Sequence, residues 1–304
     1  MSARETVRPP STAAEATAPQ LSRVPRRPHA WLWWVGASQL LVLAIWLAWS
    51  WPAGLPAMLV SHALVLVPVF RPRSRVYAPV LARLPVDDRR VWLTIDDGPS
   101  DDTAAILDLL DRHRAKATFF LVGERALARP DLVAAIAGRG HGIGNHSHTH
   151  PQAWFWALGP RRMRSEVLRA QDALTALCGQ PPRWFRSVVG MTNPFVAAPL
   201  RDAGLTRVAW SARGYDAVRA DPARVVALIE RDLAPGAIVL LHEGAPHGRS
   251  VEMIDLLLQR LDALGYASVL PEALSGATVV PNGMAAGATR SSPAATLVGT
   301  AEGR

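Results

Sequence analysis

The chain has 304 residues, 49% of them hydrophobic, and a formal net charge of +8. This length is long for one ordinary domain and short for three, and it can supply a sizeable core even after membrane segments are subtracted. The arginines that carry nearly all of the positive charge are scattered singly or lie beside apolar runs, which disfavours nucleic-acid binding. Cys178 is the only cysteine, so an intramolecular disulfide is excluded.

The first 28 residues are rich in Pro, Ala, Ser and Thr and show no apolar period, so they are expected to form a disordered tail. The run from Ala30 to Trp51 follows, uncharged and about as long as a bilayer core requires. Tryptophans stand at both of its ends, as in the aromatic belts of membrane interfaces. The run is too long for the apolar core of a signal peptide and lacks an obvious cleavage site, so it predicts a transmembrane helix.

A second apolar run extends from Ala57 to Phe70 and contains His62 and Pro68. It predicts a second span if residues from Pro52 are included, although a membrane-surface segment is an alternative. Arginines flank the two runs on both outer sides, and a hairpin with both ends in the cytoplasm would satisfy the positive-inside tendency. Residues 29–70 are therefore expected to anchor the chain in a bacterial-type inner (plasma) membrane by one or two helices. One crossing instead of two would place the rest of the chain on the other side.

Between residues 77 and 271, short strand-like runs alternate with amphipathic helical patterns, which favours a parallel α/β sheet with helices outside. The spacing suits a distorted (β/α) barrel of about seven strands better than an open sheet. Residues 272–304 are mostly small and polar and are expected to form a second disordered tail. Strands are expected at 91–95, 117–122, 142–145, 183–186, 207–210, 237–241 and 267–270, and helices at 104–113, 131–138, 161–177, 194–203, 222–233 and 251–264.

Polar residues that look out of place all follow the carboxyl ends of the expected strands. In a parallel barrel these ends meet on one face, where active sites are found. The residues concerned are Asp96 and Asp97 after the first strand, His146, His148 and His150 after the third, Arg186 at the end of the fourth, Asp216 beyond the fifth and His242 after the sixth.

Two adjacent carboxylates at the end of a buried strand repel each other and need compensation. A curled histidine loop could bring His146 and His150 onto one cation and leave His148 outside. Two imidazoles and one carboxylate, with a position open for water, are typical of a catalytic divalent metal. The other aspartate could then act as a general base near an arginine, and His242 could protonate the leaving group.

The motif "TIDDGP" at 94–99, followed by "HSHTH" at 146–150, resembles the polysaccharide deacetylases of the NodB-homology, carbohydrate esterase family 4 type. The resemblance covers roughly residues 91–270. It implies a distorted (β/α) barrel that removes N- or O-acetyl groups from sugars with a divalent metal, zinc first and Co, Ni or Mn as alternatives. It also implies that Asp96 is the catalytic base, that Asp97, His146 and His150 bind the metal, and that His242 in "VLLH" is the catalytic acid.

The middle motifs depart from the family pattern. In "RSVVG" at 186–190, Arg186 is kept and could orient the base, but Val188 replaces a proline and Val189 an aromatic residue. In "WSARGYDA" at 210–217, Arg213 replaces the first aspartate, Asp216 stands at the second and could tune His242, and Ala217 replaces a tryptophan. Amide or ester hydrolysis is therefore indicated more firmly than any particular glycan.

The aromatic residues Trp154, Phe155 and Trp156 lie beside the histidine loop. They could stack on a sugar, touch the bilayer or pack under the loop. Trp154, Trp156 and Trp210 are the candidate substrate-binding residues.

These features predict a membrane-anchored, metal-dependent hydrolase that removes an N-acetyl or other acyl group from a sugar. Its partner would be an N-acylated glycan of the cell wall or an exported polysaccharide, or a lipid-linked sugar at the cytoplasmic face, and no nucleic acid. The alternative is a catalytically silent carbohydrate-binding membrane protein with an altered groove.

Overall fold

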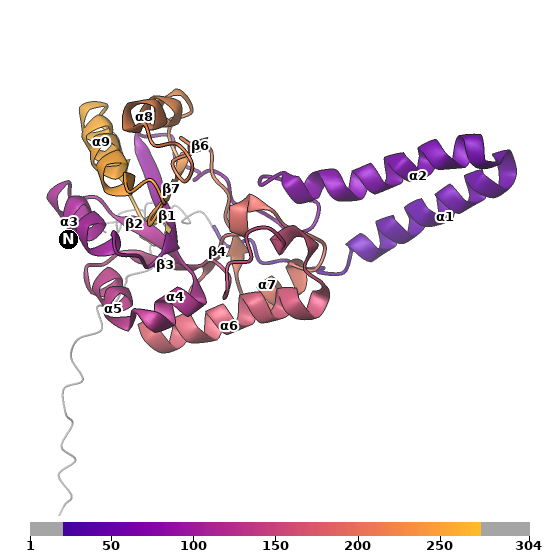
Figure 1. Cartoon of the computed structure of the whole chain (residues 1–304), viewed down its shortest axis with the longest axis horizontal. Helices are drawn as coiled ribbons and strands as arrows, with labels where there is room; N and C mark the ends of the chain where they lie inside the picture. Colours follow the sequence, from indigo (N-terminus) through magenta and orange to yellow (C-terminus); the bar gives the residue numbers. More distant parts are fainter. Residues whose placement is uncertain (1–20, 275–304) are drawn as a thin grey trace, which may run out of the picture.

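A computed structural model describes residues 21–274 and shows two parts (Figure 1). One is a compact α/β domain, and the other is a pair of long helices that projects from it. The described chain begins against the domain at Leu21, runs out and back through the helical pair, and then forms the rest of the domain.

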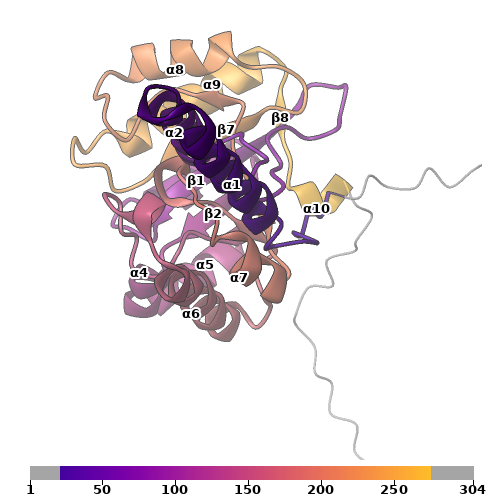
Figure 2. The same ribbon diagram turned by 90° about the vertical axis from the view of Figure 1, so that its right-hand side faces the viewer.

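The projection consists of α1 (Trp31–Trp49) and α2 (Trp51–Leu66), which is continued by the short 3-10 helix η1 (Val67–Phe70). The two helices run side by side (Figures 1 and 2), and Ser38 and Ser61 join them through hydroxyl oxygens 3.0 Å apart. Their side chains are apolar nearly all round and mostly exposed. By length and composition, Trp31–Trp49 and Trp51–Phe70 are both candidate membrane spans.

The domain is built on a curled parallel sheet, with the strand order β5-β4-β3-β2-β1-β7-β6. The central strand β1 (Arg90–Gly98) also pairs with β8 (Ala267–Ser268) at its start. The edge strands are β5 and β6. The segment with Leu81 and Arg83 connects the two sides of the sheet, because Leu81 bridges to Val208 just after β5 and Arg83 bridges to Ala237 just before β7. This is the expected distorted α/β barrel, which is therefore confirmed. The other strands are β2 (Ala117–Leu121), β3 (Gly142–Asn145), β4 (Trp184–Phe185), β5 (Thr206–Arg207), β6 (Ala212–Arg213) and β7 (Ile238–His242).

Amphipathic helices surround the curled sheet, with α8 and α9 above it and α4 to α7 below it in Figure 2. Residues of α3, α5, α6, α8 and α9 pack with the same face of β1, which carries Val91, Leu93 and Ile95. Helix α8, for example, buries Val225 and Ile229, which are four residues apart and therefore lie on one face, as expected for a surface helix. The sequence missed α4 and β6, which are too short to show a period. The helices are α3 (Thr103–Arg112), α4 (Gly123–Ala128), α5 (Pro130–Gly138), α6 (Pro160–Cys178), α7 (Ala197–Asp202), α8 (Pro222–Arg231), α9 (Ser250–Ala263) and α10 (Pro271–Leu274), with the 3-10 turns η2 (Phe155–Ala157) and η3 (Val188–Gly190).

The two expected tails reach into the described residues at their inner ends, and there the structure differs from the expectation. Leu21 is buried against the domain, and the backbone N–H of Arg23 donates to the Thr206 hydroxyl at 2.7 Å. At the other end, Trp184 Nε1 donates to Glu272 in α10 at 2.5 Å. Composition alone did not show these single anchoring contacts. Residues 1–20 and 275–304 of the two tails lie outside the described ones.

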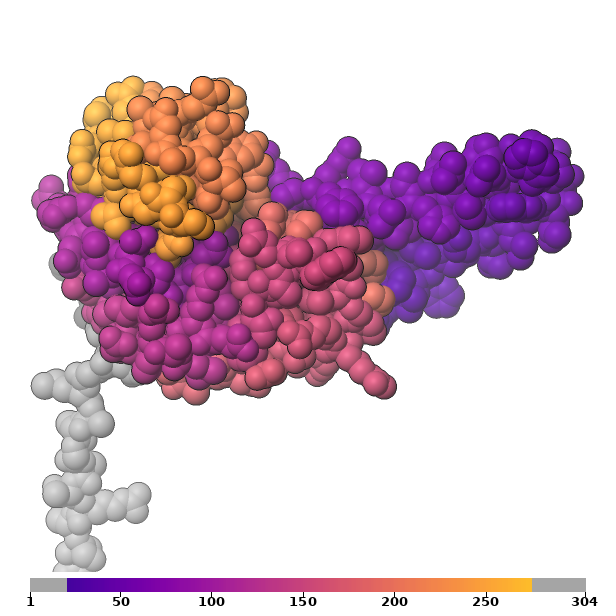
Figure 3. All heavy atoms as spheres, in the orientation of Figure 1, coloured from indigo at the N-terminus to yellow at the C-terminus, as the bar shows by residue number. Residues whose placement is uncertain are grey.

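The base of the helical projection is fixed to the domain (Figure 3). Its two ends make aromatic contacts, Trp31 with Phe195 at 5.5 Å and Phe70 with Trp156 at 5.4 Å between ring centroids. The buried guanidinium of Arg207 donates to backbone carbonyls of the connecting segment, which are those of Pro72, Ser74 and Ala78. These contacts hold the first residues after η1 against the sheet.

Candidate active site

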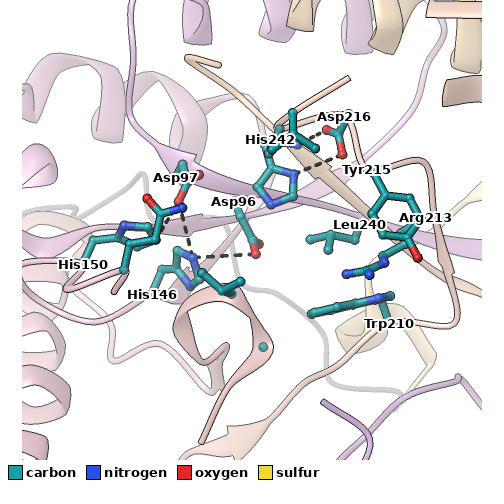
Figure 4. Close-up of a pocket in the computed structure, with 15 residues that line it drawn as sticks. Asp96, Asp97, His146, His150, Trp210, Arg213, Tyr215, Asp216, Leu240 and His242 are labelled. Atoms are coloured by element: carbon teal, nitrogen blue, oxygen red, sulfur yellow. Dashed lines mark hydrogen bonds and ion pairs between the residues drawn. The ribbon is translucent and has the colours of Figure 1, made fainter. Parts of the chain in front are cut away.

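A pocket of about 290 Å³ opens at the carboxyl ends of the central strands. Asp96 at the end of β1 lies opposite His242 at the end of β7 in the strand register, and the loop after β3 supplies the histidines (Figure 4). Residues far apart in the sequence thus meet because parallel strands end at the same edge. The predicted residues in the lining are Asp96, Asp97, His146, His150, Trp210, Asp216 and His242, and the lining also includes Val189, Arg213, Tyr215 and Val218.

Asp97, His146 and His150 form a compact group of potential metal ligands. Asp97 Oδ1 lies 2.9 Å from His150 Nε2 and 3.5 Å from His146 Nε2. One ligand atom from each of the three side chains lies within 4.8 Å of the other two. Bonds of about 2.05 Å in a tetrahedron would separate neighbouring ligands by about 3.3 Å, so these spacings suit a divalent ion.

Two further features of the group fit such an ion. Asp97 Oδ1 is buried and accepts no hydrogen bond from the described residues, although both imidazole Nε2 atoms face it. His146 Nδ1 lies 2.9 Å from the Arg186 carbonyl, which can only accept, so Nδ1 carries the hydrogen and Nε2 keeps its lone pair for a metal. Burial opposes ionisation of Asp97, but the two imidazoles that face it outweigh burial and hold its pKa well below the usual range.

The histidine loop is held in its curl by a buried acid that sequence reasoning missed. Glu166 on α6 accepts hydrogen bonds from the backbone N–H groups of His148 and Thr149, at 3.0 and 2.8 Å, and from the Thr149 hydroxyl at 2.8 Å. His148 points away from the metal group, toward Gly123 and Glu124 on α4. The loop therefore presents His146 and His150 to the pocket and leaves His148 out.

Asp96 is buried beneath the metal group and paired with Arg186. Arg186 Nη1 donates to Asp96 Oδ1 at 2.7 Å and to the Thr94 hydroxyl at 2.8 Å. The guanidinium stacks on Phe120 with its Cζ 4.2 Å from the ring centroid. Burial lowers the pKa of Arg186 while Asp96 raises it, and burial prevails. A buried, well-fixed cation of this kind orients the carboxylate of Asp96.

His242 faces the same pocket and is held by Asp216. Asp216 Oδ1 lies 3.1 Å from His242 Nδ1 and Oδ2 accepts the His242 backbone N–H at 2.6 Å. Burial alone would lower the pKa of His242, but Asp216, with Asp96 and Asp97, outweighs it and raises the pKa to about 9. The imidazole is therefore protonated at neutral pH and can donate a proton.

Strained backbone is concentrated around the pocket. Asp97, His150, Val189 and Tyr215 have φ angles of 72°, 51°, 53° and 64°, and all four line the pocket. For a β-branched residue such as Val189 this conformation is a genuine outlier. Strain of this kind persists where the surrounding structure fixes it, most often at ligand sites.

The structure separates the three candidate substrate-binding tryptophans. Trp210 lines the pocket, whereas Trp154 and Trp156 do not. Trp154 is 67% exposed, and Trp156 packs on Phe70 at the base of the projection. Phe155 between them is buried, so the run divides between core, surface and the helical pair.

Sequence reasoning also missed Glu243, which follows His242. Its buried carboxylate accepts a hydrogen bond from the Ser100 hydroxyl at 2.8 Å and another from Thr103. Burial raises its pKa. Glu243 thereby fixes the turn that follows Asp96 and Asp97. The position next to His242 was its only signal in the sequence.

The site thus combines three side chains that could hold a divalent ion, a carboxylate fixed by an arginine and a protonated imidazole fixed by an aspartate. These are the parts that hydrolysis of an amide or ester requires.

Comparison with known proteins agrees with this chemistry. Residues 83–208 match the family model described as polysaccharide deacetylase. A chitooligosaccharide deacetylase of Bradyrhizobium sp. (strain ANU 289) is 37% identical over 182 residues, which cover 59% of this chain and 82% of the relative. A crystal structure of a peptidoglycan N-acetylglucosamine deacetylase has a TM-score of 0.60 at 29% identity and covers 64% of this chain and 92% of its own. A CE4 family pseudoenzyme from Bacillus anthracis has a TM-score of 0.57 at 27% identity and covers 62% and 66%.

Proposed function

This chain belongs to the polysaccharide deacetylase family, and from that premise we propose that it is a membrane-anchored, metal-dependent enzyme that deacetylates an N-acetylated sugar. N-acetylglucosamine is the first sugar to test, because the structural relative described above is an N-acetylglucosamine deacetylase. The observation that carries the proposal is the placement of Asp97, His146 and His150 beside Asp96 and His242 in one pocket (Figure 4).

Asp97, His146 and His150 would hold the divalent ion, for which zinc suits two imidazoles and one carboxylate. When bound, the ion polarises the acyl carbonyl and makes water a stronger acid. The Arg186 carbonyl keeps the His146 imidazole in the tautomer that the ion needs.

Asp96 would act as the general base. Its carboxylate is held by Arg186 and lies with its Oδ2 3.7 Å from His146 Nε2, next to the metal group. In this position it accepts a proton from the attacking water as the new carbon–oxygen bond forms.

His242 would act as the general acid from the other side of the pocket. Asp216 holds Nδ1, so Nε2 is the nitrogen that can donate into the pocket. Its proton goes to the sugar nitrogen as the carbon–nitrogen bond breaks, which leaves acetate and a free amine.

Residues 29–70 would form the membrane anchor of a catalytic domain at 77–271. The two helices of the projection are 19 and 16 residues long and expose apolar side chains that water solvates poorly but a bilayer accommodates. A hairpin places both of its ends on the same side of the membrane, and arginines flank both ends. The catalytic domain would then lie on the cytoplasmic face of the inner membrane.

A second candidate is a silent carbohydrate-binding protein, which the likeness to the CE4 family pseudoenzyme favours. The fixed pairs Asp96–Arg186 and His242–Asp216 support turnover instead, because binding alone needs neither a base nor an acid.

Acetate release from N-acetylglucosamine oligomers by the full chain in detergent tests the proposal. Activity should disappear with a chelator and return with zinc. Asp97→Ala should lose bound metal, whereas Asp96→Asn should keep it and lose roughly 100- to 10,000-fold in kcat. Full activity in Asp96→Asn would refute the assigned base, and bound zinc without any turnover would favour the silent protein.

A further inference from the structure

One cation in the pocket has no anionic partner. Arg213 on β6 replaces an acidic residue of the family pattern and lines the pocket. Its guanidinium Cζ lies 3.9 Å from the ring centroid of Tyr215 and 5.4 Å from that of Trp210. Within residues 21–274, no carboxylate forms an ion pair with it.

The two aromatic faces fix the guanidinium without neutralising its charge. Cation–π contact and stacking orient its planar fork of N–H donors. Arg213 differs in this from arginines that carboxylates hold, such as Arg249 with Glu252 and Arg260 with Glu230. An oriented and unpaired arginine in the wall of a pocket suits a bidentate anion such as a phosphate.

Arg213 lies across the pocket from the metal group. In Figure 4, Asp97 and His150 stand at one side, Arg213 with its two rings at the other, and Asp96 and His242 between them. In the register, Arg213 lies opposite Leu240, two residues before His242. A substrate with its acyl group at His242 would therefore present a neighbouring substituent to Arg213.

The mouth of the pocket on this side is apolar. Val189 and Val218 line the pocket and are 53% and 81% exposed. Together with the ring of Tyr215, which is also exposed, they form an apolar rim. They suit a substrate that carries a hydrocarbon chain.

This wall is also joined to the base of the helical pair. Arg73, three residues after η1, donates to the carbonyls of Trp210 and Ser211 at 2.8 and 3.1 Å. The backbone N–H of Thr192 donates to the Val69 carbonyl at 3.0 Å, which ties the other side of the same wall to η1. The mouth thus opens beside the segment that would enter the membrane.

We propose that Arg213 binds the phosphate of a lipid-linked glycosyl phosphate whose hydrocarbon chain leaves the pocket over Val189 and Val218 toward the bilayer. This inference rests on the proposed membrane-anchored deacetylase and names its substrate class. The amide is cleaved at Asp96 and His242 while the phosphate stays on Arg213.

The test uses the zinc-loaded full chain in phosphatidylcholine nanodiscs and measures dissociation constants by calorimetry. The probes are N-acetylglucosaminyl farnesyl phosphate, soluble N-acetylglucosamine 1-phosphate and the neutral octyl N-acetylglucosaminide. The farnesyl phosphate should bind at least 10-fold more tightly than either of the others. Arg213→Met should weaken its binding about 10- to 100-fold, which is the worth of a hydrogen bond to a charged group.

Arg213→Met should leave binding of the neutral glycoside unchanged, which shows that the pocket is intact. Arg213→Lys should restore part of the phosphate preference. Arg224→Met, on the exposed start of α8, is the matched control and should bind all three probes as the native chain does.

Equal affinity for the soluble phosphate would overturn the lipid-linked substrate and leave Arg213 a site for free glycosyl phosphates. A phosphate preference that survives in Arg213→Met, or no affinity for either phosphate probe, would overturn the role of Arg213. Acetate release from the neutral glycoside is measured separately, so a failed inference and a failed deacetylase assignment give different results.

Discussion

Oδ1 of Asp216 lies 3.1 Å from Nδ1 of His242, and Oδ2 of the same carboxylate accepts the His242 backbone N–H at 2.6 Å. The carboxylate thus fixes the ring orientation, the tautomer and the charge of the imidazole. The two residues come from neighbouring parts of the sheet edge and are 26 positions apart in the sequence. Their pairing has consequences that can be measured.

Replacing Asp216 by Asn should lower the pKa of His242, because the neutral amide no longer offsets the burial of the imidazolium. The pKa of about 9 in the native protein should fall by roughly 1–2 units, the usual effect of removing an opposite charge at this distance. Because the protonated ring is the active form of an acid, the alkaline limb of the kcat/KM profile should move to lower pH. The measurement is acetate release as a function of pH.

The same pairing predicts a pH-dependent stability. The folded-state pKa of His242 lies above its unfolded value of about 6.5, so the stabilisation is fully present below that pH. It should be lost as the pH rises toward 9. Asp216→Asn should reduce this slope in denaturant titrations between pH 6.5 and 9. Asp232→Asn, at an exposed pair with Arg231, should not, and an unchanged slope in Asp216→Asn would contradict the pairing.

Glu166→Gln should loosen the histidine loop. The amide removes the negative charge that accepts hydrogen bonds from His148 N–H and Thr149 N–H and pairs with Arg162. We expect about 1–3 kcal/mol lower stability and roughly 10- to 100-fold weaker metal binding, as for other residues that support metal ligands. Metal affinity measured by competition with a chelating dye checks this.

Glu230→Gln is the matched control, because Glu230 is a surface residue paired with Arg260 far from the pocket. It should change neither metal affinity nor activity. Native metal affinity in Glu166→Gln would mean that the loop keeps its curl without the charge.

Gly190→Ala should damage the pocket wall more than backbone strain explains. Gly190 has a φ of 73°, and a Cβ there would come within 2.8 Å of Pro72. Gly204 has a similar φ of 65° but open space around its Cβ position. We expect about 1 kcal/mol of destabilisation in Gly204→Ala from the left-handed backbone, and about 1–3 kcal/mol more in Gly190→Ala from overpacking. Equal stability losses for Gly190→Ala and Gly204→Ala in thermal unfolding would show that Pro72 moves to make room for the added methyl group.

Topology reporters should place both ends of the helical pair on one side of the membrane. A fusion after Arg75 should report the cytoplasm, because a hairpin returns the chain to its starting side and arginines flank both ends. A fusion at Ser50, in the turn between α1 and α2, should report the opposite side. A periplasmic signal after Arg75 would mean a single crossing and would favour a wall or exported glycan as substrate.

The sequence predicted the barrel well because its strands and helices carry clear apolar periods: β3 has the expected bounds, and α5 begins one residue before the expected helix. It missed β6 and α4, whose two and six residues are too short to show a period. It could not divide Trp154, Phe155 and Trp156 between surface, helical pair and core, because adjacent residues differ only in the direction that the tertiary fold gives each side chain.

By itself the sequence determined which chemistry is present, because the types and order of Asp96, Asp97, His146, His150 and His242 limit the reactions that they can support. It also determined that the first 70 residues include two long apolar runs, whose exposure to water is unfavourable. The tertiary structure decided which groups meet: Asp216 with His242, which the sequence only suggested, Glu166 with the histidine loop, and Arg213 with the rings of Tyr215 and Trp210. These relationships depend on which strand ends adjoin and on how the loops curl, and no local pattern encodes a distance across the sheet.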